Sequence, residues 1–288
     1  MVLSTKIKRN NMKEVGQILE LEASKVTPQG IYLINEEQEE ILLPNKYIPA
    51  DLKLGEMVEV FVYTDSEDRP IATTLEPKVK LNTCAFLKCV DVNQFGAFFD
   101  WGMEKDLMVP FSEQFLRVTA GKRYLVYLYL DKVTSRLVGT TKMGRFIRQN
   151  KVEIKPGDQV DLLVSGETEI GYKVIVNNKH YGMVFKNEVF QKIEIGDKLS
   201  GFLQRVRKDD KMDITLNSSS LSDVEVLANK IFERLLKEGG KLNFSDKSAP
   251  EVIYKEFQVS KKAFRRAAGM LYKERKIIIT PEDITLVK

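Results

Sequence analysis

The sequence predicts a mainly β protein, with three tandem five-stranded barrels followed by a smaller C-terminal module of helices and strands. A pattern of glycine and apolar landmarks occurs three times, and after Thr215 the hydrophobic period changes from two residues to that of a helix. The chain has 288 residues, which is more than one compact core usually needs. We place four domains at residues 1–76, 77–150, 151–218 and 219–288.

Four landmarks define the repeat. Each copy has a glycine that opens an apolar run, a second apolar run, a glycine before an alternating segment, and a closing threonine. Each landmark shifts by 66 residues from the first copy to the second and by 75 from the second to the third, which favours an internal repeat over chance. The landmarks are Gly30, Leu42, Gly55 and Thr74; Gly96, Met108, Gly121 and Thr140; and Gly171, Met183, Gly196 and Thr215.

The second copy shows the strand pattern most clearly. Its apolar residues alternate with a period of two over short segments that Gly, Asp and Asn turn signals separate. Five such strands in about 60 residues are typical of a small closed barrel of the OB type, whose second and third strands commonly bind oligonucleotides. The predicted strands are residues 84–90, 97–100, 107–109, 124–130 and 136–140.

Four large aromatic residues crowd into the stretch NQFGAFFDWG of this copy. Alternation sends Phe99 into the core and leaves Phe98 exposed, with Phe95 on the turn before the strand. An exposed ring offers a surface on which any nucleobase can stack. We expect Trp101 in the core or at its rim. The alternative is that all four rings pack the barrel.

The second copy resembles the S1 RNA-binding domain. The resemblance implies that Phe95 and Phe98 stack on bases, that Lys88 belongs to the binding face, and that Arg136 on the last strand contacts phosphate. Pro110 stands where the family often has a histidine. The matching residues are Lys88-Cys89-Val90, Phe95-Gly96-Ala97-Phe98, Met108-Val109-Pro110-Phe111-Ser112, Gly121, Asp131 and Arg136.

Charge separates the copies. Residues 13–76 hold 5 Lys/Arg and 14 Asp/Glu, whereas residues 77–150 hold 12 and 6. A polyanion therefore favours the second copy over the first. The first copy also has Gln29 and Tyr32 at the positions of Phe95 and Phe98, so we expect it not to hold RNA by itself. Its acidity suggests instead a surface for the ribosome or another protein.

The third copy has lost the stacking pair but keeps a basic cluster. Ile170 and Lys173 occupy the two stacking positions. The cluster lies at the last predicted hairpin and suits phosphate contact, although a solvated turn beside Asp209 and Asp210 explains it equally well. Its members are Arg205, Arg207, Lys208 and Lys211.

The C-terminal module reads as three helices and a two-stranded ribbon, which predicts a winged helix. Ser222 and Glu225 suggest one capping box, Ser248 and Glu251 a second, and Ser260 caps a third helix that runs to about Arg275. The ribbon spans residues 277–287 around a Thr-Pro-Glu-Asp turn. The third helix has one apolar stripe, made of Phe264, Ala267, Ala268, Leu271 and Tyr272.

The opposite side of the third helix is basic. Residues 255–276 hold 8 basic and 2 acidic side chains, which suits phosphate contact. Glu282 and Asp283 at the ribbon tip disfavour a DNA-binding wing, and a solvated helix face remains the alternative. The candidate phosphate contacts are Lys261, Lys262, Arg265, Arg266 and Lys273.

Three S1-like barrels and a winged helix together resemble the bacterial CvfB (conserved virulence factor B) family, most closely over residues 246–277. The resemblance implies a cytoplasmic, non-catalytic RNA-binding protein that regulates gene expression after transcription.

Composition limits the other functions. The single histidine, His180, disfavours a catalytic triad or a His-rich metal site, and Cys84 and Cys89 fit neither a CxxC motif nor a zinc knuckle. We therefore expect no metal, no cofactor and no enzymatic activity. No apolar run approaches the length of a membrane span, and the N-terminus lacks a signal-peptide pattern.

The leading hypothesis is a regulator that holds single-stranded RNA. A DNA-binding transcription regulator acting through the winged helix is the main alternative, and a translation accessory factor on the ribosome is another. A ribonuclease is disfavoured, because the repeats and the winged helix leave no residues for a catalytic domain.

Overall fold

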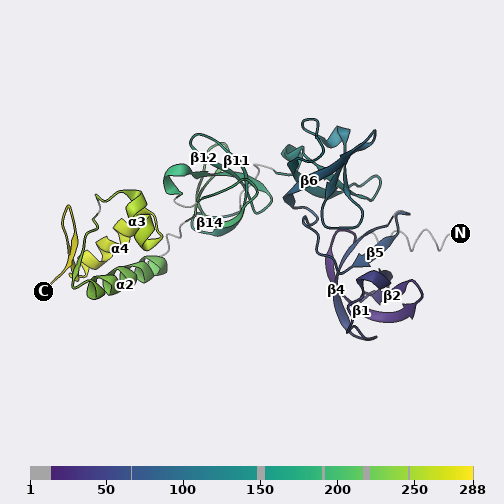
Figure 1. Cartoon of the computed structure of the whole chain (residues 1–288), viewed down its shortest axis with the longest axis horizontal. Coiled ribbons are helices and arrows are strands. Elements are labelled where there is room, and N and C mark those ends of the chain that lie inside the picture. Colours follow the sequence, from purple (N-terminus) through teal and green to yellow (C-terminus); the bar gives the residue numbers. More distant parts are fainter. Residues whose placement is uncertain are drawn as a thin grey trace. The chain divides into compact units, whose positions relative to one another are not determined.

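The computed structural model describes residues 14–65, 67–147, 153–189, 192–216, 221–245 and 247–287, apart from the side chains of residues 221–223. The chain divides into two compact units, Met1–Phe146 and Ile147–Lys288. Figure 1 shows the first barrels in purple to teal, the third in green and the helical module in yellow-green. The predicted fold class, three S1-like barrels and a winged helix, is confirmed.

The first barrel is closed by hydrogen bonds in the order β1-β2-β3-β5-β4. Antiparallel pairs join β1 to β2 and to β4, β2 to β3, and β4 to β5, and a parallel pair between β3 and β5 closes the sheet. The strands are β1 (Ile18–Thr27), β2 (Gly30–Ile34), β3 (Glu40–Pro44), β4 (Met57–Thr64) and β5 (Pro70–Thr73), with the 3-10 turn η2 (Asn45–Tyr47) after β3.

The second barrel is a five-stranded sheet in the order β10-β9-β6-β7-β8. We predicted a closed barrel, but no hydrogen-bonded ladder joins β8 to β10 among the described residues. Instead the Val109 side chain of β8 packs closely against the Gly139 backbone of β10. A Cβ added to Gly139 would lie only 2.7 Å from Val109 Cγ2. The strands are β6 (Cys84–Val92), β7 (Gly96–Asp100), β8 (Leu107–Pro110), β9 (Arg123–Leu130) and β10 (Leu137–Thr140), with η3 (Phe111–Glu113) after β8 and η4 (Met143–Arg145) after β10.

The third barrel repeats the closed order of the first, as β11-β12-β13-β15-β14. Its core is almost entirely aliphatic, with Val164, Val174 and Ile214 fully buried. The strands are β11 (Gln159–Glu167), β12 (Gly171–Val176), β13 (His180–Phe185), β14 (Lys198–Val206) and β15 (Met212–Thr215), with η5 (Lys186–Glu188) after β13.

The landmark glycines of the repeat have a steric cause. A Cβ on Gly30, Gly96 or Gly171 would approach a backbone oxygen of the next strand to 2.0, 2.5 or 2.4 Å, so only glycine allows these strand pairs. The closing threonines also act alike. Thr74 Oγ1 donates to the Tyr47 carbonyl at 2.8 Å, and Thr140 Oγ1 donates to the Glu113 carbonyl at 3.0 Å. In both barrels this bond ties the end of the last strand to the 3-10 turn.

The first two barrels share a hydrophobic cluster. Phe61 of β4 packs its ring against the edge of Trp101, with ring centroids 5.7 Å apart and an interplanar angle of 82°. Trp101 Nε1 donates to the Lys105 carbonyl at 2.6 Å, which satisfies its only polar group. Trp101 is therefore core, as expected, but it belongs to the junction of two barrels and not to one barrel alone.

The C-terminal module is a three-helix domain with a small sheet ordered β16-β18-β17. Phe264, Ala267 and Leu271 of α4 are buried against α2 and the sheet. Its elements are α2 (Leu221–Lys237), β16 (Lys241–Leu242), α3 (Pro250–Phe257), α4 (Lys261–Lys273), β17 (Ile277–Ile279) and β18 (Ile284–Leu286).

Some predicted helix signals are wrong in detail. Helix α3 begins after Ala249 without a side-chain cap, because the Ser248 hydroxyl accepts instead from the Ser245 amide. Tyr272 is exposed and not part of the buried stripe of α4. The predicted cap of α4 is confirmed, since Ser260 Oγ accepts from the Ala263 amide at 3.2 Å. The side chain of Ser222, proposed as a cap, lies outside the described residues; α2 begins at Leu221.

No helix in the described ranges is long and apolar enough to cross a membrane.

Candidate nucleic-acid interface

Strand β7 of the second barrel presents one aromatic face outward. Ala97 and Phe99 point into the core and are fully buried, whereas Phe98 between them is half-buried on the outer face. Phe98 lies directly across from Met108 of β8 and from Asp91 of β6. A flat ring is thus held in the middle of the β6–β7–β8 surface by the register of the sheet.

Phe95 extends this face at the turn before β7. Its side chain is 62% exposed, although it is a large apolar group. The Phe95 amide donates to Asn93 Oδ1 at 2.9 Å, and the Asn93 amide donates to the Gly96 carbonyl at 3.0 Å. The turn is therefore fixed by its own hydrogen bonds, and the exposed ring is presented by a well-ordered backbone. We call Phe95 and Phe98 the aromatic platform.

Two cations adjoin the platform on the same sheet. Lys88 of β6 lies across from Arg123 of β9 on one side and from Asp100 of β7 on the other. Both cations are exposed, and Arg123 Nη2 donates to the Phe86 carbonyl at 3.0 Å. One of the nearby acids, Asp100, forms an ion pair with Lys78, whose hydrogen bond lowers the Asp100 pKa.

Arg136 is held by the first barrel. Its Nε and Nη2 donate to the two carboxylate oxygens of Asp68 at 2.7 and 2.6 Å. These bonds lower the pKa of Asp68 and raise that of Arg136. A phosphate that contacts Arg136 must therefore compete with a bidentate carboxylate.

The basic cluster of the third barrel is arranged around a buried acid. Asp213 of β15 is 1% exposed, and its two oxygens accept from Arg205 Nε and Arg207 Nε, each at 2.6 Å. The carboxylate orients both guanidinium groups at the surface. Lys211 pairs with Asp209 at the hairpin turn, and Lys208 is exposed on the same turn.

The outer face of this barrel has one aromatic neighbour for the arginines. The Arg207 guanidinium lies over the ring of Phe185, 5.6 Å from its centroid. Ile170 and Lys173 are exposed at the positions that correspond to the platform. The third barrel thus offers oriented cations and one ring, but no pair of rings on its second strand.

Helix α4 carries an exposed stripe of Lys262, Arg266, Gly269 and Lys273, which we call the α4 stripe. It lies opposite the buried face of the helix, and a Cβ on Gly269 would meet nothing within 4 Å. Arg265 is exposed on the flank, and Lys261 is half-buried in the first turn. At the ribbon tip, Asp283 forms an ion pair with Lys241 that lowers its pKa, so only Glu282 adds negative charge there.

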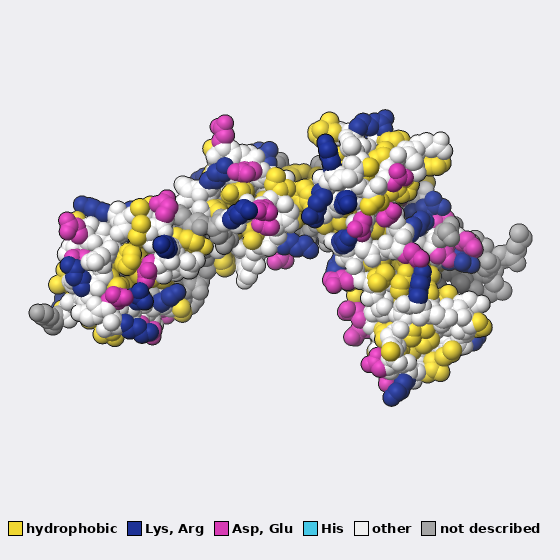
Figure 2. Space-filling model, in the orientation of Figure 1, with side chains coloured by type: hydrophobic (Ala, Val, Ile, Leu, Met, Phe, Trp, Pro, Cys, Tyr) yellow, Lys and Arg dark blue, Asp and Glu magenta, His cyan; other side chains and the backbone are white. Residues whose placement is uncertain are grey.

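The first barrel differs in charge. Glu20 of β1 lies directly across from Glu59 of β4, and both are exposed. Like charges in such a pair repel each other and disfavour a polyanion at this sheet. In Figure 2, Asp and Glu side chains follow one edge of this barrel, whereas Lys and Arg side chains spread over the second.

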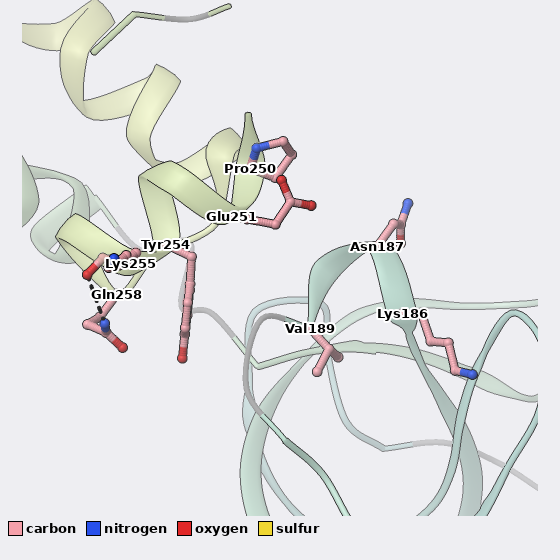
Figure 3. Close-up of a pocket in the computed structure, with 8 residues that line it drawn as sticks. All are labelled: Lys186, Asn187, Val189, Pro250, Glu251, Tyr254, Lys255 and Gln258. Atoms are coloured by element: carbon pink, nitrogen blue, oxygen red, sulfur yellow. Dashed lines mark hydrogen bonds between the residues drawn. The ribbon is translucent and has the colours of Figure 1, made fainter. Parts of the chain in front are cut away.

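Residues that often mark enzymes are not grouped in the described part of the chain. Cys84 and Cys89 are buried and form no disulfide bond, and burial raises the pKa of Cys89, which disfavours a reactive thiolate there. The described residues contain no group of His, Cys, Asp and Glu that could hold a metal ion. Figure 3 shows side chains of α3 and of the η5 turn that line a pocket; Glu251 is the one carboxylate among them, so they offer no acid pair.

The sequence located most of these side chains but missed their partners. Arg123 could have been found from the strand register, since it falls opposite Lys88 once β6 and β9 are paired. Asp213 could have been found in the same way, since it falls opposite Arg205 once β14 and β15 are paired as an antiparallel hairpin. Asp68 could not, because its role depends on a contact between a turn of the first barrel and the second barrel, for which we found no local sequence signal.

Comparison with known proteins agrees with the architecture. An S1 domain model matches residues 15–75, and a CvfB-like winged helix domain model matches residues 229–286. The S1 match falls on the first barrel, although our resemblance rested on the second.

Three relatives cover most of the chain. It is 27% identical to the uncharacterized protein YitL of Bacillus subtilis, over 94% of this chain and 93% of that protein. It is 26% identical to conserved virulence factor B of Staphylococcus epidermidis, over 83% and 82%. A crystal structure of a multidomain protein with nucleic acid binding domains from Streptococcus pneumoniae is 21% identical, over 96% of this chain and 99% of that one, with a TM-score of 0.39. The predicted resemblance is confirmed: the S1 domain and CvfB-like winged helix models match the chain, which is similar to the conserved virulence factor B proteins over most of its length.

Proposed function

We propose that this protein binds single-stranded RNA without catalysis and regulates gene expression after transcription, in the cytoplasm. The second barrel stacks bases on the aromatic platform. Lys88 contacts the backbone beside it, and Arg136 contributes when phosphate displaces Asp68. The third barrel and the winged helix add phosphate contacts through Arg205, Arg207, Lys208, Lys211, Lys261, Lys262, Arg265, Arg266 and Lys273.

The observation that carries this proposal is the exposure of Phe95 beside Phe98 on a fixed turn and strand. Leaving a large ring in water has no benefit for folding, and such rings next to cations are the means by which barrels of this type hold single strands. Duplex nucleic acid keeps its bases stacked inside the helix, so a platform for bases selects single strands.

A competition experiment tests the proposal. Fluorescence anisotropy follows a labelled single-stranded RNA on the intact protein at fixed salt while unlabelled duplex DNA is added. We expect duplex DNA to displace the RNA only weakly. Ready displacement would contradict the proposal and favour the α4 stripe as the main binding surface.

The second candidate function, DNA binding by the winged helix, is favoured by the α4 stripe alone. Three of its four residues are cations, and Gly269 lets a nucleic acid backbone approach closely. The stripe has no amide side chain for reading adenine, so we expect little sequence preference from it.

The first barrel has a supporting role in this proposal. Its acidic sheet disfavours RNA, and its shared hydrophobic cluster fixes it to the second barrel. Contact with the ribosome or another protein through this acidic surface stays a prediction.

A further inference from the structure

The second barrel carries a third aromatic group next to the platform, on the turn after β8. Gly96 pairs with Pro110, so Phe95 before β7 and Phe111 after β8 lie at the same end of the hairpin. At the equivalent positions of the other two barrels the backbones are joined directly. Asn45 donates its amide to the Gln29 carbonyl, and Lys186 donates to that of Ile170, both at 3.1 Å.

The Arg117 guanidinium lies over the ring of Phe111. The guanidinium carbon is 4.1 Å from the ring centroid, the shortest of the described cation–ring contacts. Arg117 is exposed, and a guanidinium plane is itself a surface on which bases stack. Ring and cation together therefore offer a positively charged stacking surface at the end of the hairpin where Phe95 lies.

The loop that carries Arg117 is anchored to the barrel. Gln114 is buried, and its Nε2 donates to the Val109 carbonyl at 3.0 Å while its Oε1 accepts from the Val118 amide at 3.2 Å. The Phe115 amide donates to Thr141 Oγ1 at 2.8 Å. The same loop nevertheless leaves Phe115 and Leu116 74% and 73% exposed, so ordered backbone presents apolar side chains to solvent.

Charge favours a polyanion at this loop. Arg117, Lys122 and Arg123 are exposed cations, and the nearby acid Glu113 is paired with Arg145 at 2.6 Å. The pattern is confined to this barrel. The residues equivalent to Phe111 are Asn45 and Lys186, and those equivalent to Arg117 are Asp51 and Lys192.

We propose that Phe111 and Arg117 form an additional nucleobase subsite, which extends the aromatic platform by one base of a bound single-stranded RNA. This inference rests on the proposed function, because it assumes that RNA occupies the platform. The base stacks on the Arg117 plane, and Phe111 holds that plane in position.

The test compares variants that separate stacking from charge. Arg117→Lys keeps the positive charge but removes the planar group. Phe111→Leu keeps an apolar side chain but removes the ring. Lys192→Ala is the matched control, since it removes an exposed cation at the equivalent position of the third barrel. The probes are oligouridylates of increasing length, with thermal unfolding of each full-length variant as the check on folding.

The expected result is a change in how affinity depends on length. Wild-type affinity rises until the extra subsite is filled. In Arg117→Lys it stops rising about one nucleotide earlier, with a loss of about fivefold or more for longer RNA. Lys192→Ala keeps the wild-type length at which affinity stops rising. If Phe111→Leu unfolds, the exposed Arg117 still decides the question.

Three outcomes would overturn the inference, and they are distinguishable. If Arg117→Lys binds every length as wild type does while Phe95→Ala binds weakly, the platform holds RNA but ends at Phe95. If Phe95→Ala also binds as wild type, the proposed function fails together with its extension. A loss in Arg117→Lys without a loss in Phe95→Ala would mean a separate site and not an extension.

Discussion

Phe95 and Phe99 give a matched pair of substitutions, because the two rings are four residues apart and differ in burial. Phe95 is 62% exposed, so Phe95→Ala removes little buried area and should lower the free energy of unfolding by about 1 kcal/mol or less. Phe99 is fully buried, and Phe99→Ala should cost about 3–5 kcal/mol. The two variants therefore separate packing from binding.

The effect on RNA should be the reverse. A base that stacks on an aromatic ring contributes about 1–3 kcal/mol, so Phe95→Ala should raise the Kd for single-stranded RNA about 5- to 150-fold. The assays are fluorescence anisotropy with a labelled RNA and urea unfolding of the same samples. Phe95→Ala unfolding as readily as Phe99→Ala would mean that the ring packs the barrel. A stable Phe95→Ala protein with unchanged affinity would mean that no base stacks there.

Three further predictions concern charge and sterics. Replacing the three cations of the α4 stripe with Ala should lower the salt dependence of RNA binding by about two in log–log slope, as three lost phosphate contacts require; an unchanged slope would remove the stripe from the interface. Gly96→Ala should destabilise the second barrel, because the added Cβ would lie 2.5 Å from the Val109 carbonyl oxygen. Gly144→Ala is the control, since its Cβ would meet nothing within 4 Å, and thermal unfolding of the two variants makes the comparison. Arg136 lowers the pKa of Asp68, so that pair stabilises the fold above about pH 4, and the contribution is lost as the pH falls through the folded-state pKa. Asp68→Asn should remove about 1 kcal/mol or less in urea unfolding at pH 7 and a smaller amount at pH 2; equal losses at both would contradict the pair's role.

The strand pattern was predictable because each barrel buries only one face of each strand. In the second barrel the five predicted strands match the observed ones to within two residues at each end. The repeat was visible because the same residue types recur where the fold needs them. Glycines stand where a Cβ would clash with the next strand, and threonines stand where a hydroxyl binds the 3-10 turn. The two-residue strand β16 was missed because a pair of residues has no period.

The partners of the proposed binding residues were not predictable in the same way. Alternation correctly assigned Phe99 to the core and Phe98 to the outer face, since it depends only on local backbone geometry. It could not show that Trp101 packs on Phe61 of another barrel, or that Asp68 holds Arg136. Those contacts depend on how two barrels meet, which local periodicity does not encode.

The three barrels share one sheet framework, in which the positions that folding requires differ from the positions proposed to bind RNA. The glycine landmarks lie where strands approach closely, and the platform positions lie on the outer face, so they vary without disturbing the core. At the position of Phe95 the first barrel has Gln29 and the third has Ile170. An S1 model matches the first barrel, whose charge and side chains are the least suited to RNA. A match to the S1 model therefore indicates the barrel fold and not RNA binding by that barrel. The proposal that the second barrel binds RNA depends on the side chains of its outer face.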